Sequence, residues 1–267
     1  MSVFKSFRTA GTMLAICLGL VASHAVQAQS LQDIQSRGKA RIGVLVGAPP
    51  YGSVDAMGNA IGYDADVATL VGKYLNLPVE MVQLTPPARI PALEAGKVDF
   101  LIATLARTPE REKVVSFTRP YSAFQVGIYA AKDAPVKGWE DMKGMTVGVN
   151  RGSSVEHELV DREKELGLTV LRFEDDATTM QALFSGQVQA VASPEAQSNA
   201  AIKARGDDTV AAKFFFSMQP NSMAVRKDAT ELQGKLNEII GKMIETGELN
   251  AISEEWVGSP LPQLPSE

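Results

Sequence analysis

The chain has 267 residues, a formal net charge of −5 and a single cysteine, Cys17. An acidic balance of this size argues against nucleic acid or an anionic membrane surface as a partner. The length is enough for one large or two medium domains.

Residues 1–28 have the pattern of a cleavable secretory signal. Lys5 and Arg8 precede an uncharged apolar run, and Val26 and Ala28 are small residues at the positions a signal peptidase reads. The run is too short for a comfortable membrane span, so a retained anchor is the weaker alternative. Removal of this segment takes away two bases and no acid, which changes the net charge from −5 to −7. It also removes Cys17, so the exported protein has no disulfide and depends on its core.

From residue 41 onward, apolar runs alternate with amphipathic stretches, as expected for an α/β fold with a mostly parallel sheet. Strands are expected at residues 41–46, 79–84, 100–103, 125–130, 146–149, 169–173, 190–192 and 223–225. Helices are expected at 64–74, 153–166 and 232–244. The proline-rich segment 260–265 is expected to be a solvated terminus.

Two segments, 90–103 and 180–193, align without gaps, and each has the pattern of a helix, a glycine turn and a short buried strand. Chance similarity between two such units is one explanation. Recurrence at a domain-sized spacing favours the other, two lobes of similar construction. A small ligand then binds between the lobes, at the carboxyl ends of the strands.

The stretch TLARTPERE, residues 104–112, places an arginine where a helix begins. Thr108 suits the N-cap and Pro109 the first helical position, but Arg111 lies at the unfavourable positive end of the helix dipole. Together with Thr104 at a strand end, Arg111 has the chemistry of a carboxylate receptor. The alternative is a surface ion pair of Arg111 with a nearby glutamate.

A second candidate anion site follows the strand expected at 146–149. There Gly152 is followed by Ser153 and Ser154, which offer N–H groups and a hydroxyl at a helix start. A plain N-cap is the alternative. Tyr51, in a loop after the first strand, is either a ligand-facing or a structural aromatic.

Catalytic and metal chemistry find little support in the sequence. Beyond the signal there is one histidine, His157, between two glutamates in an expected helix, and it has the pattern of a solvated surface residue. No nucleophile, phosphate-loop, zinc or dinucleotide motif is present, and we expect no cofactor and no metal.

The sequence resembles family 3 extracellular solute-binding proteins, periplasmic receptors that deliver polar amino acids to ABC transporters. The segments that carry the resemblance are PPYG (49–52), GYDADVATLVGKYLNLPVEM (62–81), RIPALEAGKVDF (89–100), TPEREKVVSFTRPY (108–121), WEDMKGMTVGVNRGSS (139–154) and GELNAISEEWVG (247–258). The resemblance implies a two-lobed, type II periplasmic binding protein-like α/β fold with two hinge segments. The first lobe takes residues 29–124 and 221–267, and the second takes 125–220. A membrane permease is the implied partner, and we expect a monomer.

The resemblance also implies roles for individual residues. Arg111 corresponds to the arginine that binds the ligand α-carboxylate, assisted by Thr104. Gly152 and Ser154 match the carboxylate-binding turn of the second lobe, and Tyr51 matches an aromatic that packs on the ligand. Arg89 occupies a position where receptors for acidic amino acids hold the side-chain carboxylate.

One position departs from the family pattern. Where an aspartate usually binds the ligand ammonium, this chain has Pro194, followed by Glu195. A buried ammonium without a charged partner is costly. The sequence therefore predicts either that Glu195 replaces the aspartate or that the ligand is a carboxylate without an α-amino group.

Exported cyclohexadienyl dehydratases resemble the same two-lobed fold and give the rival, enzymatic interpretation. No evident catalytic pair of carboxylates supports it, so we expect a binding protein rather than an enzyme.

Overall fold

The computed structural model describes residues 31–206 and 208–265. The expected signal segment, residues 1–28, lies outside them. Within the described ranges no helix is long and apolar enough to cross a membrane.

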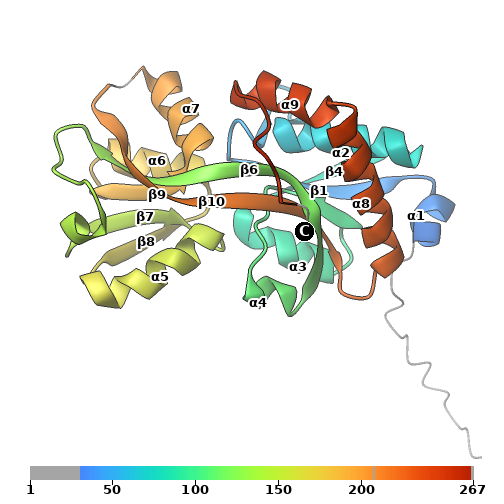
Figure 1. Cartoon of the computed structure of the whole chain (residues 1–267), viewed down its shortest axis with the longest axis horizontal. Helices are drawn as coiled ribbons and strands as arrows, with labels where there is room; N and C mark the ends of the chain where they lie inside the picture. The colour runs from blue at the N-terminus through green and yellow to red at the C-terminus, as the bar shows by residue number, and fades with distance from the viewer. Residues whose placement is uncertain (1–30, 207, 266–267) are drawn as a thin grey trace, which may run out of the picture.

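The first lobe is built on three parallel strands, with β1 between β4 and β5. The strands are β1 (Ala40–Leu45), β4 (Val79–Leu84) and β5 (Phe100–Ile102). Helices α2 and α9 pack together on one side of the sheet, and α3 lies on the other (Figure 1). The helices and 3-10 turns of this lobe are α1 (Leu31–Arg37), α2 (Tyr63–Leu75), η1 (Pro86–Ala88), α3 (Arg89–Glu94), α4 (Pro109–Glu112), α8 (Thr230–Glu245) and α9 (Glu248–Val257). A small hairpin joins β2 (Ser53–Val54) and β3 (Ala60–Ile61).

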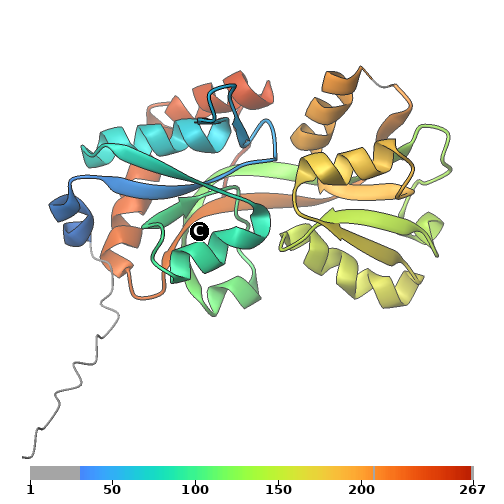
Figure 2. The same ribbon diagram turned by 180° about the vertical axis from the view of Figure 1, so that it is seen from behind.

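The second lobe repeats this plan with β7 between β8 and β9, again all parallel. Its strands are β7 (Thr146–Asn150), β8 (Thr169–Phe173) and β9 (Ala190–Pro194). Its helices are η2 (Trp139–Met142), α5 (Ser154–Leu166), α6 (Asp176–Phe184) and α7 (Glu195–Arg205). The view from behind shows them around the strands of the second lobe, apart from the helices of the first lobe (Figure 2).

Two long antiparallel strands, β6 (Val115–Ala131) and β10 (Val210–Arg226), cross from one lobe to the other (Figures 1 and 2). They make one continuous sheet in the order β4-β1-β5-β10-β6-β9-β7-β8. The fold is therefore two-lobed α/β, as the sequence predicts. The boundaries expected near residues 124 and 220 fall inside these strands and stay a prediction.

The expectation of a mostly parallel sheet was only partly right. The pairs within each lobe are parallel, but β10 runs antiparallel to both β5 and β6, and β6 runs antiparallel to β9. The two crossing strands were predicted only as short pieces, 125–130 and 223–225. Their patterning is broken by prolines and by register shifts between Ala212 and Phe214 and between Asn221 and Ala224. Such irregularities interrupt the alternation of side chains that identifies a strand.

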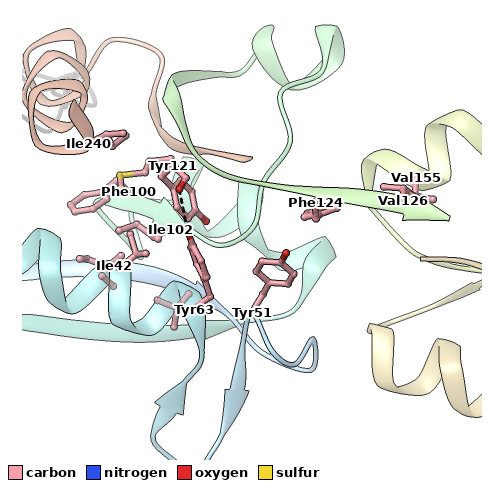
Figure 3. Close-up of a cluster of buried hydrophobic side chains, with 14 of the residues drawn as sticks. Ile42, Tyr51, Tyr63, Phe100, Ile102, Tyr121, Phe124, Val126, Val155 and Ile240 are labelled. Carbon is pink, nitrogen blue, oxygen red and sulfur yellow. Dashed lines mark hydrogen bonds between the residues drawn. The ribbon is translucent and has the colours of Figure 1, made fainter. Parts of the chain in front are cut away.

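The helix expected at 232–244 is confirmed as α8, which buries one face against the sheet: Leu232, Leu236, Ile239, Ile240 and Met243. In the same core Tyr63 donates a hydrogen bond to the Tyr121 carbonyl across 3.1 Å (Figure 3). This contact fixes α2, the helix whose first turn faces the gap between the lobes, against crossing strand β6.

The proline-rich terminal segment is not simply solvated. Leu261 is half-buried, and its N–H donates to Asn250 Oδ1 across 3.0 Å. Pro262 and Pro265 line cavities that also contain Met218 of β10. The segment therefore lies against the crossing strands.

Candidate functional site

A cavity lies between the two lobes beside the crossing strands. Because the carboxyl ends of the parallel strands of both lobes face the same gap, loop and helix-start residues collect there. The lining residues are Leu45, Pro86, Arg89, Thr104, Arg111, Phe124, Asn150, Ser153, Ser154, Val155, Asp176, Ala192, Pro194 and Gln197.

Arg111 enters this cavity from the first turn of α4. Thr108 is the N-cap, as predicted, and its Oγ1 accepts from the Arg111 N–H across 3.3 Å. The guanidinium donates to the Ala106 carbonyl (2.6 Å) and to the Gly152 carbonyl of the second lobe (2.7 Å). Burial and the neighbouring Arg89 lower the Arg111 pKa to about 9, so the group is cationic at neutral pH. Arg111 therefore spans the gap rather than pairing with a surface glutamate.

Arg89, the first residue of α3, is 4% exposed and points to the same carbonyl. Its guanidinium donates to the carbonyls of Pro86, Ala103 and Thr104, each at 2.9 Å, and to that of Gly152 at 3.4 Å. Burial lowers the Arg89 pKa to about 10. Two buried cations from the first lobe thus converge on one backbone oxygen of the second, a concentration of positive charge suited to an anion.

Thr104 takes a left-handed backbone conformation, with φ of 47°. Its hydroxyl donates to Asp64 Oδ2 and the Tyr121 hydroxyl donates to Asp64 Oδ1, both across 2.6 Å. Burial raises the pKa of the fully buried Asp64 to about 7, against the opposing effect of these two hydrogen bonds. Because its proton is directed to Asp64, the Thr104 hydroxyl presents lone pairs to the cavity.

The turn at Gly152 brings the second lobe into contact with the first. Gly152 has φ of +69°, and a Cβ there would lie 3.2 Å from Pro87 Cα of the first lobe. Its N–H donates to Glu156 Oε2, while Ser153 caps α5 by accepting from the Glu156 N–H. The Ser154 hydroxyl donates to Gln219 Oε1 on β10. The turn is thus a true N-cap whose side-chain donors are already used within the chain, and it offers the Gly152 carbonyl to the two arginines.

Asp176 and Gln197 complete the wall on the side of the second lobe. Both are buried, and Gln197 Nε2 donates to Asp176 Oδ2 across 3.1 Å. Burial raises the pKa of Asp176 to about 7, and the Asn150 side chain and Arg89 act in the opposite direction.

Residues 40–259 match the family model described as bacterial extracellular solute-binding proteins, family 3. The chain belongs to this family.

The chain is 26% identical over 255 residues to the L-cystine-binding protein TcyJ of Escherichia coli K12, covering 93% of this chain and 95% of that protein. Among solved structures it is similar to an ancestral arginine-binding protein bound to arginine, with TM-score 0.78, 35% identity and 82% and 98% of the two chains covered. It is also similar to the ancestral amino acid-binding protein AncCDT-1, a precursor of cyclohexadienyl dehydratase, with TM-score 0.77, 29% identity and coverage of 85% and 99%.

The structure of this solute-binding protein brings five of the predicted site residues into one cavity: Arg89, Thr104, Arg111, Ser153 and Ser154. Gly152 is joined to it through its carbonyl. Tyr51 and Glu195 instead lie together in a neighbouring cavity. Burial raises the Tyr51 pKa most, and the negative charges of Asp64 and Glu195 raise it further. The Tyr51 ring packs on Phe124, centroid to centroid 5.6 Å, and Phe124 borders both cavities (Figure 3).

Sequence reasoning missed Asp64, Asp176 and Gln197. Asp64 and Asp176 lie in the first turns of α2 and α6, where an acid is usually explained by the helix dipole. Asp176 also follows strand β8, and position after a parallel strand was a signal that pointed to the gap. In the described part of the chain, no group of three or more histidine, cysteine or acidic residues is arranged to hold a metal ion.

Proposed function

We propose that this protein is the periplasmic substrate-binding component of an ABC importer, and that it captures an amino acid or a related small carboxylate between its lobes. The observation that carries the proposal is the convergence of Arg89 and Arg111 on the Gly152 carbonyl. A ligand carboxylate offers the same kind of acceptor with a full negative charge, and it binds a guanidinium through two parallel hydrogen bonds.

In this proposal the carboxylate takes donors of Arg111 and Arg89, while the Gly152 turn closes over it from the second lobe. The Thr104 hydroxyl donates its proton to Asp64, so it offers lone pairs to a donor group of the ligand and not a hydrogen bond to the carboxylate. The partner is the membrane permease of the importer, the protein acts as a monomer, and its location is the periplasm after cleavage of residues 1–28. Tyr51 and Glu195 remain candidate ligand residues of the adjoining cavity.

Isothermal titration calorimetry tests the proposal with two panels, the L-amino acids including L-cystine, and small organic acids without an amino group. We expect submillimolar or tighter binding of at least one carboxylate compound. If neither panel gives heat or thermal stabilisation, the proposal is wrong.

We also propose that the protein is not an enzyme, because the described residues that line the cavity include a single acid, Asp176, and so no pair of adjacent carboxylates. Prephenate incubated with the purified protein should remain unchanged, as followed by ultraviolet absorbance. Turnover that is abolished by Asp176→Asn would instead establish the dehydratase-like alternative.

A further inference from the structure

The wall of the cavity on the side of the second lobe contains a buried acceptor without a partner. Gln197, on α7, is 3% exposed, and its Oε1 has no hydrogen-bond partner in the described part of the chain. Its Nε2 is committed to Asp176, which fixes the amide so that Oε1 is the free end. A buried acceptor left unpaired is unfavourable, so the position is suited to a donor supplied from outside the chain.

Asp176 lies beside it and supplies the charge. It is 6% exposed and, of the described residues that line the cavity, it is the only acid. The charged groups that face it are Arg89 from α3 and Asp175, the N-cap of α6. The cavity therefore has guanidinium groups on the side of the first lobe and two acceptors, one a carboxyl group, on the side of the second.

Pro194 and Glu195, at the start of α7, do not place an acid in this cavity. Pro194, the N-cap of α7, borders the cavity with a ring that has no acceptor. Glu195, one residue on, lines the adjoining cavities with Tyr51 and Trp256 rather than this one. The acid that faces this cavity therefore comes from another element, α6.

We propose that Asp176 and Gln197 together bind a cationic N–H group of the ligand, opposite the carboxylate site at Arg111. The inference rests on the proposed function, and it narrows the substrate class to molecules that carry both a carboxylate and an ammonium or guanidinium group. The cation is either the α-ammonium of an amino acid or a cation at the end of its side chain, and the two sources are separable.

The test compares Asp176→Asn and Gln197→Leu with a control, Asp175→Asn, by calorimetry, and Glu195→Gln examines the rival assignment of the cation to Glu195. Each probe is paired with its analogue lacking the α-amino group. The pairs are L-glutamine with 4-carbamoylbutanoate, L-cystine with 3,3′-dithiodipropionate, and L-arginine with 5-guanidinopentanoate.

If the cation is the α-ammonium, Asp176→Asn weakens the amino acid that the wild type binds by about 30-fold or more and changes its deaminated analogue by less than about threefold. If the cation belongs to the side chain, Asp176→Asn lowers the affinity for L-arginine and for 5-guanidinopentanoate by a similar factor. Gln197→Leu gives a smaller loss of the same pattern, and the Asp175→Asn control binds as the wild type does. A merely structural role of Asp176 would also weaken 4-carbamoylbutanoate and 3,3′-dithiodipropionate, which carry no cation, as much as their amino acids, in which case the proposal is wrong.

Amino acid binding that survives Asp176→Asn, or that is lost in Glu195→Gln instead, also overturns the assignment and leaves the proposed function intact. A wild type that binds none of the carboxylate probes overturns the proposed function itself.

Discussion

Four buried charged residues, Arg89, Arg111, Asp64 and Asp176, dominate the chemistry of the cavity region. Isolated buried charges are strongly unfavourable, and here each is held by hydrogen bonds to carbonyls, hydroxyls or amides. Arg89 is also attracted by both aspartates. Arg89 therefore affects the protonation of the other three residues.

Asp64 gives a prediction about the pH dependence of stability. The unfolded chain releases this proton near pH 4, whereas burial holds it in the folded protein until about pH 7. The folded state binds more protons between these values, so its contribution to the free energy of unfolding is fully present below pH 4 and is lost as the pH rises to 7. In Asp64→Asn, we expect the decline between pH 4 and pH 7 to be smaller by roughly 2–4 kcal/mol.

Urea unfolding at several pH values measures the effect. The raised pKa of Asp176 contributes to the pH dependence of both the wild type and Asp64→Asn. The difference between their unfolding free energies therefore reports Asp64. Asp66→Asn, which removes a carboxylate bonded to Trp256 from the same helical turn, is the matched control. Identical pH slopes in wild type and Asp64→Asn would contradict the role given to this carboxyl.

At the scale of elements, the first turns of four helices supply the polar residues around the gap. Asp64, Arg111, Asp176 and Glu195 lie in the first turns of α2, α4, α6 and α7. Helices α4, α6 and α7 follow strands β5, β8 and β9, whose carboxyl ends face the gap, so their first turns face it as well, whereas α2 follows the small β2–β3 hairpin. The candidate binding residues are thus distributed over both lobes.

The same elements show how much was predictable. Strands β4 and β8 were predicted with their observed bounds, and Arg111 was found because a cation in a first turn contradicts a local rule. Asp64 and Asp176 are acids in a first turn, where the helix dipole favours them, so the local sequence does not indicate that they are buried. The full lengths of β6 and β10 were missed because their pattern reflects two lobes and a crossing rather than one regular sheet.

Gly152 gives a prediction for the element that joins the lobes. Gly152→Ala adds a Cβ that presses on Pro87, so we expect the affinity for the bound ligand to fall about tenfold as closure is hindered. Gly167→Ala is the matched control, since Gly167 has φ of +64° and nothing within 4 Å of an added Cβ. Both variants should lose about 1 kcal/mol of stability from backbone strain. Equal affinities in the two variants, measured by calorimetry, would mean that the Gly152 contact does not limit closure.

At the scale of the whole molecule, the lobes are joined by two strands and meet across the gap through backbone atoms at two glycines. The Ala177 N–H donates to the Gly47 carbonyl across 3.2 Å, and the Gly152 carbonyl accepts from Arg111. Contacts of this kind are few and polar, so lobe closure is expected to depend on what lies between them.

Export gives a prediction for the whole chain. We expect the protein expressed in a Gram-negative host to be recovered from the periplasmic fraction with Gln29 as its first residue, because residues 26–28 have the pattern of a cleavage site. Intact-mass spectrometry reads the new N-terminus. A periplasmic protein that keeps residues 1–28 would show that the segment is an anchor.

In the proposed function Arg111 binds the ligand carboxylate, and calorimetry on Arg111→Ala measures its contribution to affinity. Arg107→Ala is the matched control, because Arg107 lies four residues away and is exposed in an ion pair with Glu112. With the tightest-binding compound of the two panels, we expect Arg111→Ala to lose about 30-fold or more in affinity and Arg107→Ala to change by less than about threefold. Undiminished binding by a folded Arg111→Ala protein would contradict the account.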